Sequence, residues 1–164
     1  FLPVIATFWF GLSAFEAGII ISLSILATGL LQRPFGIFAD IFSKTGLIVI
    51  GTVIVSLSLI VIPFTAGFFG LIIVSFILGI GSALAMPAST AVVAIAGREF
   101  GQGACMGAFN TAMSVGMVTS PIISGYIMDI LDIRAVFEIA GIISLISAIA
   151  FLVLARRAGI DAYH

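Results

Sequence analysis

Long apolar stretches separated by short polar breaks run through the whole chain. They divide it into six segments, and all but the first approach or exceed the about 20 residues that a helix needs to cross a bilayer. The segments cover about Phe1–Leu12, Ala17–Ala39, Gly46–Phe64, Phe68–Ala96, Gly103–Met128 and Ala135–Ala155. We predict helices, because an open sheet would leave backbone groups unpaired in lipid, and a β-barrel would show alternating segments of about ten residues.

The composition points to the same class of protein. Hydrophobic residues make up 62% of the sequence and charged residues 8%, and the mean hydropathy is +1.41. This leaves too little polar surface to coat a water-soluble globule. We therefore predict an all-α, polytopic membrane protein, with residues 1–164 forming one bundle of six transmembrane helices. The net charge of −1 offers no basic face for nucleic acid.

The first segment is shorter than the others. Phe1–Leu12 cannot span a bilayer, and neither an initiating Met nor a basic region precedes it. We interpret it as the end of a helix whose beginning is missing, and the chain as a fragment.

The loops are short, so consecutive helices should be antiparallel neighbours. Basic residues gather on one side of the predicted membrane, whereas acidic residues surround Arg134 on the other. Because cytoplasmic loops carry the Lys/Arg excess, we expect a cytoplasmic C-terminus, in a bacterial or archaeal inner membrane. The basic side holds Arg33, Lys44, Arg98, Arg156 and Arg157, and the opposite side holds Asp129, Asp132, Arg134 and Glu138.

Two segments share an internal pattern. In the second, Gly29 precedes Pro34 and Gly36 precedes Asp40; in the fifth, Gly116 precedes Pro121 and Gly125 precedes Asp129, at the same spacings. The matching segments occupy the same place in two successive three-helix units, and the second unit must enter the membrane from the opposite side. Such 3+3 inverted repeats are typical of secondary transporters.

The fifth segment also carries small residues every four positions. Such spacing lets two helix backbones approach closely, so we predict a tight helix–helix contact. Pro121 in this segment, and Pro87 in the fourth, each remove a backbone hydrogen bond and should kink their helices, either as flexible joints or as static packing devices. The small residues are Ala104, Ala108, Ala112, Gly116, Ser120 and Ser124.

The loop GIFADIFSKTG resembles the signature between paired helices of the major facilitator superfamily. Gly36, Ala39, Asp40 and Lys44 match it, whereas Ser43 and Thr45 depart from it. The stretches LGIGSALAMPA and MGAFNTAMSVGMVTSPIISGYIMD are similar to the family at the corresponding places. The resemblance implies half of a twelve-helix fold. Ser75, where N-terminal halves of drug exporters commonly have Arg, favours the C-terminal half, although GMVTSPIISG partly resembles an antiporter signature of the N-terminal half.

The resemblance implies a secondary active transporter and not an enzyme. It would move a small solute by alternating access, with drug/proton antiport as one option. A metabolite or organic-anion importer of the same superfamily is the alternative, and a membrane assembly module that transports nothing is a third. The expected partners are a small-molecule substrate, the lipid bilayer and the missing other half. No cofactor is expected.

The same resemblance assigns a gating role to the loop. Asp40 would hold two helices together in the outward-facing state, with Lys44 or Arg33 as its partner in this chain, and Gly36 completes the motif. Alternatively, the partner of Asp40 belongs to the missing half. Arg33 lies near a helix end, where its side chain can instead extend to the headgroups.

Few polar side chains lie within the predicted helices. Gln32 and Asn110 either hydrogen-bond across helices or contact substrate. Phe8 and Phe76 are cavity-wall candidates that ordinary packing explains equally well. No Asp, Glu or His lies in mid-helix, so a coupling ion such as H⁺ should bind outside this chain. No Walker lysine, catalytic arrangement or metal-ligand set is apparent.

Overall fold

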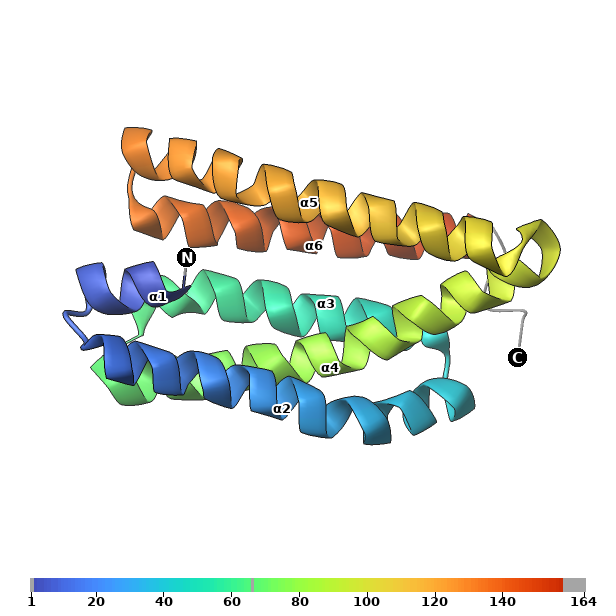
Figure 1. Ribbon diagram of the computed structural model, residues 1–164, viewed down its shortest axis with the longest axis horizontal. Coiled ribbons are helices and arrows are strands. Elements are labelled where there is room, and N and C mark those ends of the chain that lie inside the picture. The colour runs from blue at the N-terminus through green and yellow to red at the C-terminus, as the bar shows by residue number, and fades with distance from the viewer. Residues whose placement is uncertain (1, 66, 158–164) are drawn as a thin grey trace.

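The computed structural model describes residues 2–65 and 67–157, and for Asp40 it describes the backbone alone. Within these residues the chain is a helix bundle, which confirms the all-α prediction (Figure 1). Five helices are long and apolar enough to cross a membrane. The elements are α1 (Leu2–Val4), the π-helix η1 (Ile5–Trp9), α2 (Ala14–Ile41), α3 (Lys44–Val61), the 3-10 turn η2 (Ile62–Phe64), α4 (Gly67–Phe100), α5 (Gln102–Ile130) and α6 (Ile133–Arg157).

Serine caps explain why two helices begin earlier than the apolar pattern predicts. α2 begins at Ala14 because the Ser13 side chain accepts a hydrogen bond from Glu16 N at 3.3 Å, while the Glu16 carboxylate accepts one from Ser13 N at 2.8 Å. This reciprocal capping box satisfies backbone donors that a helix start leaves unpaired. α3 begins at Lys44 because Ser43 Oγ accepts from Gly46 N at 3.2 Å.

The connection between α4 and α5 is a single residue. Gly101 has φ +92°, a conformation that side chains disfavour, and it reverses the chain between two long helices. α4 therefore extends to Phe100, so Arg98 lies in its last turn and not in a loop as predicted. A cation there interacts favourably with the carbonyl end of the helix.

The bundle has two ends, which we name by one residue each. The Trp9 end holds η1, the starts of α2, α4 and α6 and the ends of α3 and α5; the Lys44 end holds the opposite termini (Figure 1). α4 packs against both α2 and α3, and α3 packs against α6. α5 runs beside α6 at the edge of the bundle and has no buried residue.

Glycines bring the central helices into close contact. A Cβ added to Gly51 of α3 would lie 2.6 Å from the Gly81 carbonyl oxygen of α4, and one added to Gly81 would lie 2.8 Å from the Gly51 oxygen. A Cβ on Gly79 would lie 2.7 Å from the Ser24 oxygen of α2. At these places a side chain would push the backbones apart, as expected for small residues at membrane-helix crossings.

Two hydroxyls tie helices together, one at the contact of α3 with α6 and one at the crossing of α2 with α4. Ser56 Oγ donates to the Gly141 carbonyl of α6 at 2.7 Å, and Ser56 is fully buried. Thr28 Oγ1 lies 2.9 Å from the Ser24 carbonyl of its own helix and 3.2 Å from the Gly79 carbonyl of α4. Such bonds contribute modestly but fix the register of one helix on another.

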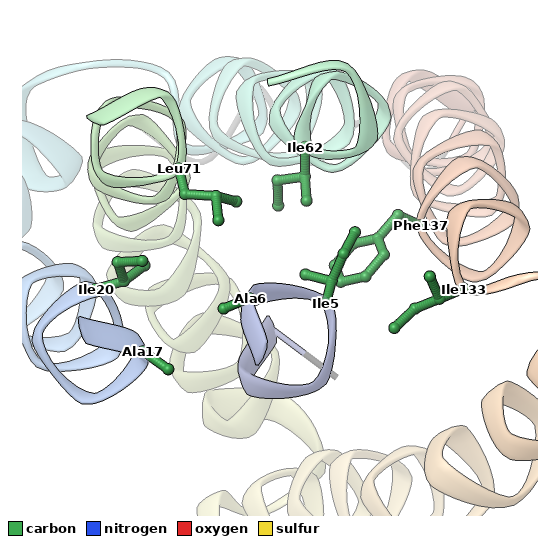
Figure 2. Close-up of a cluster of buried hydrophobic side chains, with 8 residues drawn as sticks. All are labelled: Ile5, Ala6, Ala17, Ile20, Ile62, Leu71, Ile133 and Phe137. Atoms are coloured by element: carbon green, nitrogen blue, oxygen red, sulfur yellow. The ribbon is translucent and has the colours of Figure 1, made fainter. Parts of the chain in front are cut away.

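The hydrophobic core is largest at the Trp9 end, where the short first helix inserts among the others. Figure 2 shows Ile5 and Ala6 pointing into a ring of apolar side chains from three long helices and η2. The ring consists of Ala17 and Ile20 of α2, Ile62 of η2, Leu71 of α4, and Ile133 and Phe137 of α6.

At the surface of the Trp9 end, a cation–π contact joins η1 to α6. The Arg134 guanidinium lies 4.2 Å from the centroid of the Trp9 ring, and Arg134 N donates to Asp132 Oδ1 at 3.3 Å. Arg134 is in the first turn of α6, where the helix dipole disfavours a cation. The ring and the neighbouring carboxylate offset that cost.

We expect Arg134→Gln to loosen η1. The substitution removes a contact that contributes about 0.5–1 kcal/mol at an exposed site. Trp9 is the only tryptophan in the sequence, so its fluorescence reports on this contact directly. Acrylamide should quench Trp9 more strongly in Arg134→Gln than in the control Arg98→Gln at the other end. Equal quenching in both variants would contradict the contact.

Candidate functional site

A cavity of about 500 Å³ opens between α2, α3, α4 and α5, toward the middle of the bundle. α4 contributes four lining residues on one helix face, and α3 contributes two, close in sequence to Gly51. The lining residues are Thr28, Gln32, Thr52, Val55, Ser82, Ala85, Met86, Ser89, Phe109 and Met113.

The chemistry of this lining is apolar with a few neutral hydrogen-bonding groups. None of the lining residues carries a formal charge. Met86, Met113 and Phe109 offer polarizable, adaptable surface. The Thr28 hydroxyl is already engaged with carbonyls, as are those of Thr52 and Ser89, which lie 2.7 Å from Ile48 O and 2.8 Å from Ala85 O. The cavity therefore suits an apolar occupant better than an ion.

Only one of the four predicted substrate contacts lines this cavity. Gln32 does, on the α2 side. Asn110 is exposed on α5, next to the lining residue Phe109. Phe8 of η1 is 85% exposed and Phe76 of α4 is 41% exposed, and neither lines the cavity. The structure thus brings Gln32 together with Phe109 and Met113, which the sequence did not single out.

The predicted gating residues gather at the Lys44 end. Gly36 and Asp40 lie in the last turns of α2, and Lys44 is the first residue of α3. Arg33 is exposed, two turns before the end of α2. Neither Arg33 nor Lys44 forms an ion pair with a carboxylate that the structure describes. The Asp40 side chain lies outside the described part, so its gating role stays a prediction.

The predicted packing residues lie on open helix faces. A Cβ added to Gly116 or Gly125 of α5 would meet nothing within 4 Å. Pro121 and Asp129 are exposed in α5, and Asp129 lies at the Trp9 end, opposite Asp40. Pro87 lies inside α4, between the cavity residue Met86 and the buried residue Ala88. Within the described chain, the small-residue stripe of α5 does not make the tight contact that its spacing predicts.

Sequence reasoning missed the glycines that do make tight contacts. Gly79 and Gly81 lie within the quoted stretch LGIGSALAMPA, but their role as crossing points was not recognised. Gly51 and Gly141 stand alone in apolar segments, without a repeated spacing. Glycine frequency in a membrane helix gives little information on which glycine faces a neighbour.

Long apolar helices that cross at glycines are the architecture of a polytopic membrane protein. The model of the Major Facilitator Superfamily matches residues 1–161 of the chain. The chain belongs to this superfamily. A comparison with solved structures found no match.

Three relatives illustrate the range of the family. An uncharacterised MFS-type transporter of Methanocaldococcus jannaschii is 31% identical over 85% of this chain and 36% of its own length. A multi-drug resistance efflux pump of Streptococcus pneumoniae is 26% identical over 83% and 34%. A probable L-galactonate transporter of Escherichia coli is 30% identical over 90% and 32%. The chain spans about a third of the length of these curated relatives.

Proposed function

We propose that this bundle is one half of a secondary active transporter, which moves a small solute by alternating access between itself and a second bundle. The observation that carries the proposal is the uncovered edge formed by α5. This helix has no buried residue, and the residues of its small-residue stripe from Ala104 to Ser120 are exposed. Small residues at this spacing permit close approach of another helix, so we propose that α5 packs against the second bundle.

The charge distribution supports an orientation for this half. Lys44, Arg98, Arg156 and Arg157 lie at the Lys44 end, whereas the Trp9 end has Arg134 beside three carboxylates. By the positive-inside rule we place the Lys44 end, and with it the C-terminus, in the cytoplasm of a bacterial or archaeal cell. The carboxylates of the described side chains lie near helix ends, so we place the proton or other coupling ion in the second bundle.

For the substrate, we propose an amphipathic or lipophilic compound that the protein exports. Large apolar side chains are exposed on α2 and α5, Asn110 adds a neutral polar group on α5, and one relative is named as a multi-drug efflux pump. A second candidate is import of an organic acid. It is favoured by Arg33, an exposed cation on α2, and by the relative named as a probable L-galactonate transporter.

Transport by the protein with its second bundle, in proteoliposomes under a pH gradient, tests both the mechanism and the direction. We expect movement of a lipophilic dye and none of a sugar acid. Gly116→Leu should reduce the rate at least about tenfold, because overpacking an interface costs about 1–3 kcal/mol and 1.4 kcal/mol is a factor of ten. Val118→Leu, on the other side of α5, is the matched control.

Equal rates in Gly116→Leu and Val118→Leu would contradict the α5 interface. Movement of the sugar acid alone, lost in Arg33→Gln, would support the second candidate. If neither solute moves and the chain forms a homodimer that Gly116→Leu disrupts, the protein is an assembly module and not a transporter.

A further inference from the structure

Two polar side chains that line the cavity form no hydrogen bond within the described part of the chain. The hydroxyls of Thr28, Thr52 and Ser89 donate to backbone carbonyls of their own helices. The Gln32 amide and the Ser82 hydroxyl have no such partner, although both line the cavity. A polar group that faces an apolar space without a partner is costly, so these two groups favour a polar partner in the cavity.

Gln32 and Ser82 lie next to each other along two parallel helices. Both α2 and α4 begin at the Trp9 end and run toward the Lys44 end (Figure 1). Their relative register is fixed where Thr28 Oγ1 lies 3.2 Å from the Gly79 carbonyl oxygen. Gln32 follows Thr28 by four residues and Ser82 follows Gly79 by three, so each lies about one helical turn beyond this contact. We call Gln32 and Ser82 the polar pair.

The apolar surface of the cavity comes largely from α4 and α5. Met86 lies four residues after Ser82 on α4, and α5 contributes Phe109 and Met113, which are also four residues apart. Met86 is 38% exposed and Met113 is 36% exposed, so neither side chain is held in the core of the bundle. Methionine side chains are flexible and polarizable, and they adapt to apolar partners of different shapes.

The cavity lacks a charge that would balance a charged solute. Among the described residues that line it, all are uncharged. Arg33 directly follows Gln32 in α2 but does not line the cavity. Transfer of an ion from water to such a site is expensive unless the ion finds a partner of opposite charge. The lining therefore selects against cations and anions alike.

We propose that the cavity binds an uncharged amphipathic solute. Its hydrogen-bonding end contacts the polar pair, and its apolar part lies against Met86, Phe109 and Met113. An alcohol or an amide fits the polar pair, because a glutamine amide and a serine hydroxyl can each donate and accept a hydrogen bond. The inference rests on the transporter function proposed above, because it defines the class of solute that this cavity carries.

Equilibrium binding to the full-length protein in detergent tests the inference. The fluorescent probes are anthracenes that differ in one group: a primary carboxamide, a methyl group, a carboxylate or a trimethylammoniomethyl group. We expect the carboxamide to bind about fivefold more tightly than the methyl probe, because a hydrogen bond between neutral groups contributes modestly. The carboxylate and the ammonium probe should bind at least about tenfold more weakly than the carboxamide.

Substitutions in the polar pair test where this preference arises. Gln32→Leu and Ser82→Ala should each weaken carboxamide binding by about threefold to fivefold and leave methyl-probe binding unchanged. Gln102→Leu, at an exposed position at the start of α5 and outside the cavity, is the matched control and should bind both probes normally.

Three results would overturn the inference. The first is equal binding of the carboxamide and the methyl probe by the unmodified protein. The second is an equal loss of both probes in Gln32→Leu and Ser82→Ala, which a structural role of these residues would produce. The third is binding of the carboxylate or the ammonium probe as tightly as the carboxamide.

Transport of the carboxamide probe in proteoliposomes tests the proposed function separately. Selective binding without transport would contradict the transporter function and support the site. Transport of all the probes at similar rates, without a preference in binding, would support the transporter function and overturn the inference.

Discussion

Gly51→Ala is expected to separate α3 from α4 and to destabilise the bundle more than any other single-methyl change considered for this chain. The new Cβ would lie 2.6 Å from the Gly81 oxygen and 2.7 Å from the Ala85 nitrogen. Both atoms belong to the backbone, so no side-chain rotation can relieve the overlap. The strain should cost about 3 kcal/mol, the upper part of the range for overpacked cores.

The matched control is Gly29→Ala in α2. A Cβ at Gly29 would meet nothing within 4 Å, so this change should be neutral or stabilise the helix by about 0.5–1 kcal/mol. In detergent, the temperature at which the monodisperse species is lost should fall by about 6–12 °C for Gly51→Ala alone. If the two variants melted together, the α3–α4 crossing would not be as close as described.

Asp40→Asn should abolish most transport while leaving the amount of protein in the membrane unchanged. Asp40 lies in the last turn of α2, where the carbonyl end of the helix disfavours a negative charge. The start of α3, four residues later, offers the opposite end of a helix dipole and the Lys44 cation. We expect a carboxylate at this position to stabilise one arrangement of the corner, so removing its charge should shift the balance between transport states.

The measurement is dye transport in vesicles, normalised to the amount of inserted protein. We expect at least about a tenfold loss, which corresponds to about 1.4 kcal/mol between two states. Glu99→Gln, an exposed acid at the same end of the bundle, should transport normally. Unchanged rates in Asp40→Asn would rule out a gating role for the corner, and loss in both variants would point to net charge instead.

Asp40 is distinctive in the sequence, because a charge next to apolar runs is rare and costly. Gly51 is distinctive only in the tertiary structure, because nothing near it in the sequence separates it from Gly29 or Gly116. An added methyl group is expected to have opposite effects at Gly51 and Gly29, although both are glycines in the middle of apolar helices.

The apolar pattern predicted the class, the number of segments and the antiparallel order, because in lipid a long apolar run has one stable form. Helix ends were less well predicted. The pattern marks where hydrocarbon contact stops, whereas α2 and α3 begin where Ser13 and Ser43 cap them, and α4 continues through Arg98 to the reversal at Gly101.

By itself, the sequence determined that this chain consists of long apolar helices suited to a membrane and that Asp40 and Asp129 lie at opposite ends of the bundle, and it predicts that the two three-helix units are related by inversion. These features follow from local chemistry: solvation of the backbone, charge at the membrane edge and repeated spacing. The tertiary structure alone decided which small residues meet a neighbour. It placed Gly51, Gly79, Gly81 and Gly141 at crossings, left most of the α5 stripe exposed, and opened a cavity between α2, α3, α4 and α5. Contact depends on how several helices rotate about their axes together, and no single segment encodes that rotation.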